Sequence, residues 1–309
     1  MQRDNPKNMQ ALLRFALSGT EKEDRTHSTD LTAMSEERRR WLSEALENLS
    51  VSVVDKLTKA LEVLSAKSEV QDEQEPSIME EALDTIINFV DYTDNANDFQ
   101  KIGGLSVLKP CLESSHNIVR EKCAELIATL TQNNPYCQKH ILQADLLPVL
   151  LKMTEEDSSK AASVKAVSAI SCLCRNNLEA QQELGRCDGI LTLIRLLQTD
   201  NERMRNKTAF FLAALCQENA TYCNDMCSKG LVEQIANLLQ KERDASHEHL
   251  ISALVTLVGC TPQALLECRR SDLMLETVLK SCIENADPES NMEEIEGCRQ
   301  LLALAFPAN

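Results

Sequence analysis

Aromatic residues, glycine and proline are scarce in this 309-residue chain. Aromatic side chains make up 3% of the residues, and there are only 8 glycines and 8 prolines. An all-β protein of this length needs more turns than these residues supply, so the composition favours helices. The hydrophobic content of 43%, dominated by leucine and alanine, is sufficient for a large core. We therefore expect an all-α protein.

Long hydrophobic runs are also missing. No stretch approaches the 18 or more apolar residues of a membrane-spanning helix. The first ten residues, MQRDNPKNMQ, lack the basic and then apolar order of a secretory signal. Both absences predict a cytoplasmic protein, located in the cytosol or the nucleus, with no membrane partner.

Positively charged residues are few. The chain has 32 Lys and Arg against 48 Asp and Glu, so its formal net charge is −16. Nucleic-acid binding depends on Lys and Arg that neutralise phosphates, so nucleic acid is an unfavourable partner. Anionic membrane surfaces are disfavoured for the same reason. A protein partner is the expectation that remains.

The chain has 13 cysteines, but their pattern does not predict disulfides or a metal site. The number is odd and no secretory signal is present, which argues against a disulfide framework. The close pairs Cys172/Cys174 and Cys223/Cys227 do not match the C-x2-C doublets of structural zinc sites. We expect reduced thiols that pack in the core, as free cysteine does. Several stand in apolar stretches, namely Cys123, Cys172, Cys174 and Cys216.

Motifs for catalysis and cofactor binding are absent. The sequence has no glycine-rich phosphate loop, no nucleophile elbow and no H-E-x-x-H. The one histidine cluster, His247-Glu248-His249, places its two histidines on different faces of a helix, where they chelate a single metal poorly. We predict that the chain is not an enzyme and carries neither cofactor nor metal.

A repeat of about 42 residues is the strongest feature that is present. Five segments align without gaps, and their starts are separated by 41, 43, 42 and 42 residues. They are EALDTIINFV from Glu81, KCAELIATLT from Lys122, KAVSAISCLC from Lys165, KTAFFLAALC from Lys207 and HLISALVTLV from His249. The sixth and ninth residues of each segment are large and apolar, which predicts a buried helical ridge.

A second apolar element recurs at the same period, with Gly or Asp at or just before its first Leu or Ile. The five copies are GGLSVLKPCL, ADLLPVLLKM, CDGILTLIRL, SKGLVEQIAN and RSDLMLETVL. Asn-rich turns separate the two elements, at Asn95/Asn97, Asn133/Asn134, Asn176/Asn177 and Asn219. Asparagine suits such turns because it tolerates left-handed backbone. Three helices per unit predict a right-handed solenoid of about four to five armadillo-type repeats, closed by helical caps.

The ends of the chain divide into further segments. Residues 1–33 combine a short amphipathic piece with a polar stretch that has too little apolar content to order itself, so a flexible segment is expected. The amphipathic piece either packs on the body of the protein or engages a partner. Residues 34–78 are predicted to hold the amino-terminal capping helices and an acidic linker, residues 79–261 the repeats, and residues 262–309 the carboxy-terminal capping helices.

The first positions of the repeat helices form a basic series in an acidic protein. Lys122, Lys165, Lys207 and His249 recur at repeat spacing, and Arg205 stands close to Lys207 in the sequence. In a regular solenoid these residues lie along one surface as a ladder. Solvation of surface lysines is the simpler interpretation, but a lysine at a helix start opposes the helix dipole. We interpret the ladder as a binding surface for an acidic protein partner.

Several motifs resemble one known family. The order NMQALLRFAL, MSEERRRWLSEAL, DYTDNANDF, VKAVSAISCLCR and NKTAFFLAALC is similar to that of the armadillo-type Hsp70-binding proteins, and the resemblance covers nearly the whole chain. It implies a co-chaperone whose concave face binds the Hsp70 nucleotide-binding domain and promotes ADP release. In that family a flexible amino-terminal segment helps to discharge substrate, and residues 1–33 hold that place here.

The resemblance also implies contact residues. They comprise Asp94, Asn95, Ala96 and Asn97 of the DNAN segment, and the helix starts Lys122, Lys165 and Lys207. These helix starts coincide with the basic ladder. A monomeric protein is expected. The alternative function is that of a peptide-binding armadillo adaptor, which the single tryptophan at position 41, outside the repeats, disfavours.

Overall fold

The computed structural model describes residue 40 and residues 53–66 and 76–307. Two compact units are distinguished, Met1–Lys56 and Leu57–Asn309, and the elements below all belong to the second. The amino-terminal segment predicted at residues 1–33 lies outside the described residues, as does much of the predicted cap and linker at residues 34–78. Within the described part of the second unit the regular elements are helices, with no strand.

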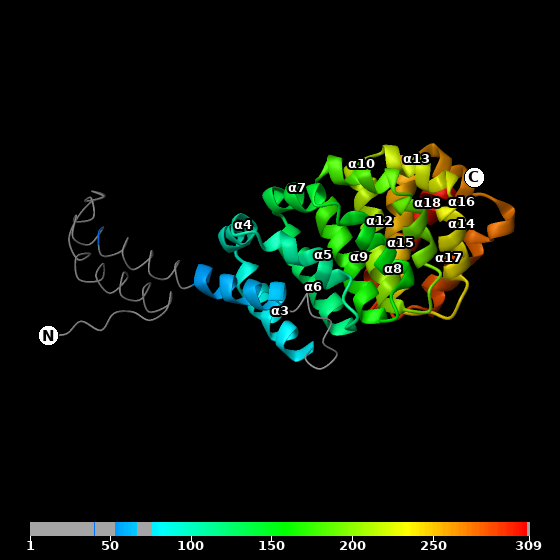
Figure 1. The fold of residues 1–309 in the computed structure, drawn as a ribbon. Helices are drawn as coiled ribbons and strands as arrows, with labels where there is room; N and C mark the ends of the chain where they lie inside the picture. Colours follow the sequence, from blue (N-terminus) through cyan, green and yellow to red (C-terminus); the bar gives the residue numbers. More distant parts are fainter. Residues whose placement is uncertain (1–39, 41–52, 67–75, 308–309) are drawn as a thin grey trace, which may run out of the picture. The chain divides into compact units, whose positions relative to one another are not determined.

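The longest helices form one layer of the unit. They are α3 (Pro76–Val90), α6 (Asn117–Thr131), α9 (Lys160–Cys174), α12 (Glu202–Glu218), α15 (Ser246–Cys260) and α18 (Met292–Ala305). Each of these helices packs against the next in this order. In Figure 1 the series runs from α3 in cyan to α18 in red. The first five contain the five repeated segments, so the repeat predicted from the sequence is confirmed. The prediction that Lys122, Lys165, Lys207 and His249 start their helices is wrong, because α6, α9, α12 and α15 begin three to five residues earlier. The sixth, α18, adds one long helix within the predicted carboxy-terminal cap.

The apolar ridge of these helices forms the core. The sixth residues of the five segments are at most 1% exposed, and they are Ile86, Ile127, Ile170, Leu212 and Leu254. Each such side chain contributes roughly 1.5–3 kcal/mol when it is buried. The ninth residues are buried as well, except for the partly exposed Phe89 at the amino-terminal end of the layer.

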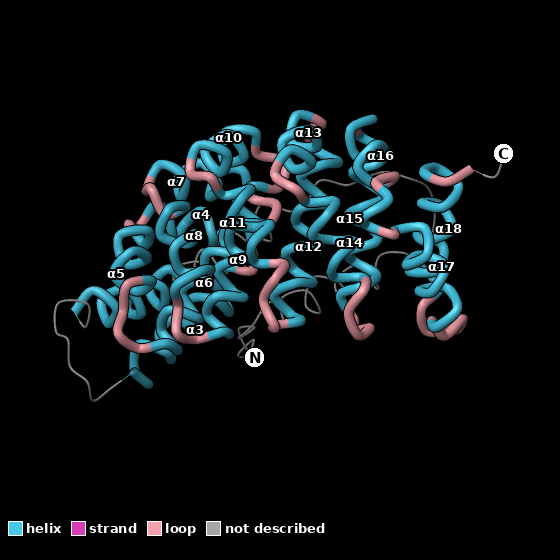
Figure 2. Tube along the Cα trace, turned by 90° about the vertical axis from the view of Figure 1, so that its right-hand side faces the viewer, coloured by secondary structure: helices cyan, strands magenta, loops and turns pink. Residues whose placement is uncertain are grey.

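Two shorter helices complete each repeat. The first series is α4 (Thr93–Lys101), α7 (Pro135–Gln143), α10 (Leu178–Arg186), α13 (Thr221–Ser228) and α16 (Pro262–Cys268). The second is α5 (Leu108–Leu112), α8 (Leu147–Glu156), α11 (Gly189–Leu196), α14 (Leu231–Leu239) and α17 (Leu275–Asn285). Short 3-10 turns, Gly104–Val107 and Ser271–Leu273, precede α5 and α17. Helices α7, α10, α13 and α16 follow one another along one edge (Figure 2). This arrangement confirms an all-α solenoid of armadillo type.

Asparagine forms the turn after two of the long helices, as the sequence predicts. Asn133 and Asn176 both have φ of 52°, in the left-handed region. The following residues, Asn134 and Asn177, cap α7 and α10 by accepting hydrogen bonds from the amides of Cys137 and Ala180. The turn predicted at Asn95/Asn97 is wrong, because both residues lie inside α4.

The turn before the last helix of each repeat also takes positive φ. The four residues in this conformation in the first four repeats are the predicted Gly or Asp, namely Gly103, Asp145, Asp188 and Gly230, with φ between 54° and 86°. In the fifth repeat Met274 takes this place, with φ of 49°, instead of Asp272. The Asp272 carboxylate binds the Arg270 guanidinium instead, with Nη2 and Oδ2 2.6 Å apart.

All 13 cysteines are free thiols, and ten of them are buried. Core packing is confirmed for Cys123, Cys174 and Cys216, whereas Cys172, which the sequence also places in the core, is only partly buried. Among the described residues, no group of three or more His, Cys, Asp or Glu is placed to hold a metal ion. The same part of the chain contains no helix both long and apolar enough to span a membrane.

Candidate partner-binding surface

The ladder residues contact the preceding long helix in a regular way. The first residue of a repeat segment lies against the fourth residue of the segment before it. Lys122 on α6 meets Asp84 on α3, with Nζ and Oδ1 2.5 Å apart, and the hydrogen bond raises the pKa of Lys122. Lys165 on α9 meets Glu125 on α6 at 2.7 Å. These two lysines therefore join neighbouring repeats, and half-exposed pairs of this kind contribute about 0–1 kcal/mol each.

Lys207 on α12 departs from this pattern. The fourth residue of the preceding segment is Ser168, which has no carboxylate to pair with the ammonium. Lys207 is exposed and makes no ion pair within the described part of the chain. Of the three ladder lysines, it is the one whose charge remains available to a partner.

Phe210, one turn further along α12, is unusually exposed for an aromatic residue. Its exposed fraction is 57%. The guanidinium carbon of Arg175 lies 5.3 Å from the ring centroid, and the ring of His249 on α15 lies edge-on at 6.4 Å. Arg175 is held in turn by Glu218, with Nε and Oε1 3.6 Å apart. The phenyl ring is therefore oriented by neighbours on both sides and still open to solvent.

A groove adjoins Phe210 where α9 and α12 meet. Its volume is about 480 Å³. It is lined by Gln132, Asn133, Val167, Ser168, Ser171, Cys172, Arg175, Asn176, Lys207 and Phe210. The groove thus combines one unpaired ammonium, one guanidinium, one aromatic ring and several hydroxyl and amide groups. We name it the α9–α12 groove.

Arg205, although close to Lys207 in the sequence, has a different environment. Its guanidinium forms an ion pair with Asp244 and donates to the carbonyl oxygen of Thr199 at 2.6 Å and to Ser246 Oγ at 3.4 Å. Only 14% of the side chain is exposed. These contacts tie the start of α12 to the start of α15.

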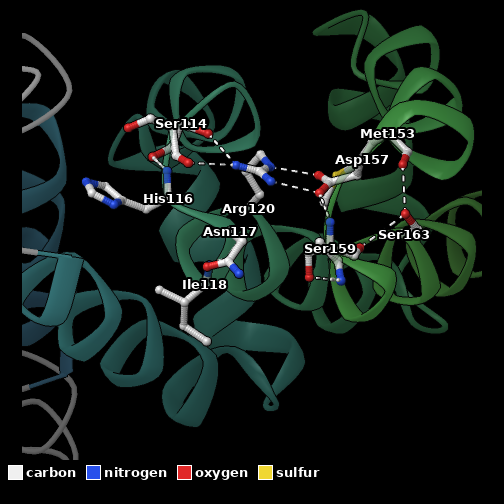
Figure 3. Close-up of polar contacts among 11 residues, drawn as sticks. Ser114, His116, Asn117, Ile118, Arg120, Met153, Asp157, Ser159 and Ser163 are labelled. Carbon is white, nitrogen blue, oxygen red and sulfur yellow. Dashed lines mark hydrogen bonds and ion pairs between the residues drawn. The ribbon is translucent and has the colours of Figure 1, made fainter. Parts of the chain in front are cut away.

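Arg120 makes the same kind of link between α6 and α9 (Figure 3). Its Nε and Nη2 donate to the two carboxylate oxygens of Asp157, both at 2.7 Å, and its Nη1 donates to the Ser114 carbonyl at 2.8 Å. Asp157 also accepts from the Ser159 amide at 2.7 Å. Burial opposes ionisation of Asp157, but hydrogen bonds from Arg120 and Ser159 lower its pKa below the ordinary value.

The DNAN residues are largely committed to internal contacts. Ala96 is 1% exposed, and Asn95 donates from Nδ2 to the Phe89 carbonyl at 2.8 Å. Asn97 Oδ1 accepts from Asn134 Nδ2 at 3.2 Å. Asp94 is exposed in the first turn of α4. The segment therefore offers Asp94, together with the 71% exposed Tyr92 beside it, to a partner.

The sequence interpretation missed Phe210 and Arg175. A signal for Phe210 is present at the fourth position of the repeat segments, which reads Asp84, Glu125, Ser168, Phe210 and Ser252. One aromatic residue in a polar series indicates an exposed apolar group. Arg175 has no comparable signal, because its position over the ring depends on how α9 and α12 pack.

Comparison with known proteins adds evidence from the whole sequence. A family model described as the SIL1/FES1/HPBP1 C-terminal domain matches residues 95–280, and a model described as nucleotide exchange factor Fes1 matches residues 9–99. The first match covers more than half of the chain. Hsp70-binding protein 1 from Rattus norvegicus is 33% identical over 314 residues, which cover 97% of this chain and 86% of the rat protein.

The chain belongs to the SIL1/FES1/HPBP1 family of armadillo-like nucleotide exchange factors.

A relative from yeast matches a shorter part of the chain. The Hsp70 nucleotide exchange factor fes1 of Schizosaccharomyces pombe is 30% identical over 116 residues, which cover 37% of this chain and 39% of the yeast protein. Among solved structures, the designed armadillo repeat protein YIII(Dq)4CqI has a TM-score of 0.66 at 17% identity and covers 81% of this chain and 99% of its own. The likeness to that structure supports the armadillo fold.

Proposed function

We propose that this family member is a co-chaperone that binds the nucleotide-binding domain of Hsp70 and promotes release of ADP. The observation that carries the proposal is the relationship to Hsp70-binding protein 1, which extends over 97% of the chain. The fold agrees with it, because a stack of helices offers a long surface for another protein. The protein acts as a regulator of another protein's ATPase and performs no chemistry itself.

The energetic basis of exchange is the coupling between two binding equilibria. A partner that binds the ADP-free form of the nucleotide-binding domain more tightly shifts the domain toward that form. By reciprocity the partner weakens the binding of ADP to the domain by the same factor. A hundred-fold preference of the partner for the ADP-free form therefore lowers the ADP affinity about a hundred-fold. The solenoid needs only to be complementary to the opened domain.

We place the centre of the contact surface at the α9–α12 groove. Lys207 supplies a positive charge without an internal partner, and Phe210 supplies exposed apolar area between Arg175 and His249. Aromatic residues and arginine are enriched at the centres of protein interfaces, and Phe210 and Arg175 lie together here. The matching patch on Hsp70 is therefore a carboxylate next to an apolar side chain.

The other predicted contact residues take different places in this proposal. Lys122, Lys165 and Asp94 lie at the margin, where solvated charges contribute more to association rate than to affinity. We assign Arg205 and Ala96 to the fold, since the guanidinium of one is bound internally and the other is buried. We further propose a monomer in the cytosol that binds neither nucleic acid nor membranes.

Isothermal titration calorimetry with the isolated Hsp70 nucleotide-binding domain tests the coupling. We expect the dissociation constant for the nucleotide-free domain to be at least tenfold lower than for the ADP-saturated domain. Equal affinities for the two forms mean that binding transmits nothing to the nucleotide, which contradicts the proposed exchange activity. A peptide-binding adaptor predicts that second result.

A further inference from the structure

The place where α9 meets α12, which we call the α9–α12 joint, is packed less closely than the other joints between long helices. Among neighbouring long helices of the described chain, α9 and α12 have the smallest packing contact, well below that of α6 with α9 or of α12 with α15. The last helices of the repeats show the same break. Helix α8 packs on α5 and on α11, and α14 packs on α17, whereas α11 and α14 hardly touch. Each repeat of a solenoid contacts only its neighbours, so no other part of the fold makes up for a loose joint.

The lysine–carboxylate pair that links the earlier repeats is missing at this joint. Lys165 on α9 pairs with Glu125 on α6. On α12 Lys207 takes the place of Lys165, and the residue of α9 in the place of Glu125 is Ser168. The Ser168 hydroxyl donates to the Val164 carbonyl of its own helix at 3.1 Å. Both helices are fully described, and no ion pair joins Lys207 to α9.

A second link, made by arginine, is missing at the same joint. Arg120 near the start of α6 forms an ion pair with Asp157 in the turn before α9, and Arg205 near the start of α12 forms one with Asp244 in the turn before α15. Each arginine stands two residues before the ladder residue of its helix, and in α9 that residue is Ser163. The Ser163 hydroxyl donates to two carbonyl groups that precede α9 in the chain, both at 3.2 Å. The side chain in the arginine position of α9 therefore does not reach forward to the turn before α12.

The carboxy-terminal ends of α9 and α12 are held together instead. Glu218, near the end of α12, accepts hydrogen bonds from the Asn176 amide at 2.8 Å and from Gln181 Nε2 at 2.7 Å. Its other carboxylate oxygen lies 3.6 Å from Nε of Arg175. Only 16% of the Glu218 side chain is exposed. The two helices are thus fixed at one end and lack the usual links at the other, which is the geometry of a hinge.

The first half of α12 also carries two buried polar atoms that have no hydrogen-bond partner in the described part of the chain. They are Oδ1 of Asn206 and Oγ1 of Thr208. A buried polar atom without a partner destabilises the arrangement that buries it. The packing around the first half of α12 is therefore less stable than its burial alone suggests.

We propose that the α9–α12 joint is a hinge of the solenoid. The helices from α3 to α11 move as one body and those from α12 to α18 as another. The pivot lies at Glu218, and the amino-terminal ends of α9 and α12 separate and approach. The links at the neighbouring joints, Arg120 with Asp157 and Arg205 with Asp244, keep each body rigid on its own side.

The hinge changes the width of the α9–α12 groove, because the two bodies line it from opposite sides. Val167 and Ser168 come from α9, and Lys207 and Phe210 from α12. The groove therefore adjusts to the partner that occupies it. This consequence for Hsp70 rests on the proposed function, whereas the hinge itself is a property of the free chain.

Electron–electron distance measurements on the free full-length protein test the hinge. Spin labels are carried on a non-canonical amino acid, so that the 13 native thiols stay unlabelled. One pair, at Asn117 and Glu202, spans the α9–α12 joint, and a reference pair, at Glu202 and Met292, spans two other joints; all three residues are exposed first residues of long helices. We expect the distance distribution of the first pair to be at least twice as wide. Equal widths overturn the proposal.

A third pair of labels locates the pivot. Lys139 on α7 and Thr221 on α13 are exposed and lie on helices that follow the carboxy-terminal ends of the long helices. We expect their distance distribution to be as narrow as that of the reference pair, although the two sites lie on opposite sides of the joint. A distribution as wide as that between Asn117 and Glu202 contradicts a pivot at Glu218.

Ser168→Glu tests why the joint is loose. The substitution places a carboxylate opposite Lys207, as Glu125 is placed opposite Lys165, so we expect the distribution between Asn117 and Glu202 to narrow to the reference width. Ser168→Gln adds a side chain of the same size without the charge and should leave the width unchanged. If both variants narrow it equally, or if neither does, the missing ion pair is not the cause.

The distances in the unsubstituted chain test the hinge even where a variant at position 168 fails to fold. Because Hsp70 is absent from these measurements, they are independent of the proposed exchange function. A wide distribution combined with no effect on ADP release supports the hinge and contradicts the function. A narrow distribution combined with accelerated release does the reverse.

Discussion

Lys207→Glu is expected to weaken binding to the Hsp70 nucleotide-binding domain by about ten- to hundred-fold. That factor corresponds to about 1.4–2.8 kcal/mol, the range for reversing one well-placed interface charge. Lys207 has no carboxylate partner on α9, so the substitution breaks no ion pair within the chain. The dissociation constant from calorimetry should rise while the thermal unfolding midpoint stays unchanged.

Lys152→Glu is the matched control for this substitution. Lys152 lies on α8, outside the α9–α12 groove, and is 72% exposed. It makes only a loose contact with Glu156, with Nζ and Oε2 3.7 Å apart. The change in net charge is the same, so any general effect of added negative charge is shared. If both variants bind equally well, or lose the same affinity, Lys207 is not at the contact surface.

Arg120→Ala is expected to lower the free energy of unfolding by about 3 kcal/mol. Only 14% of the Arg120 side chain and 3% of the Asp157 side chain are exposed. Removing the guanidinium leaves a buried carboxylate without its partner, which typically costs 3–5 kcal/mol. Urea unfolding followed by circular dichroism measures the loss. Arg186→Ala is the control. It breaks the ion pair between Arg186, whose side chain is 70% exposed, and Glu183, and it should change the free energy of unfolding little.

The loss in Arg120→Ala should also depend on pH. The pKa of Asp157 is lowered in the folded protein, so the pair stabilises the fold above the ordinary aspartate value of about 3.9. That contribution disappears as the pH falls through the lowered pKa, because a protonated Asp157 carries no charge to pair with the guanidinium. The difference in the free energy of unfolding between wild type and variant should be largest at neutral pH and should become smaller in acid. A difference that stays constant with pH contradicts an ionic role for this pair.

The repetitive part of the fold was predictable from the sequence because it depends on local patterns. The sixth residue of each segment falls on the apolar face of its helix because of the local sequence pattern, and stacking of the repeats then buries it. Asn133 and Asn176 adopt left-handed backbone because asparagine tolerates it better than other non-glycine residues. Family membership was recognisable for the same reason, since it resides in contiguous motifs.

The roles of single ladder residues depend on contacts between repeats, and the repeat pattern alone does not give them. Lys165 and Lys207 occupy the same position in their helices, yet one faces Glu125 and the other Ser168. Arg205 is basic and adjacent to the ladder, but its side chain forms an ion pair with Asp244 and donates a hydrogen bond to the Thr199 carbonyl oxygen. The DNAN segment contains residues typical of turns, and the packing of Ala96 and Phe99 in the core keeps it helical instead.

Stopped-flow measurement of labelled ADP release from Hsp70, with and without this protein, tests the central claim most directly. The labelled nucleotide is chased with excess unlabelled nucleotide, so the fluorescence decay gives the dissociation rate constant. We predict that saturating wild-type protein raises this rate constant at least tenfold and that Lys207→Glu needs a higher concentration to reach the same rate. A rate constant unchanged by saturating wild-type protein contradicts the proposed exchange function.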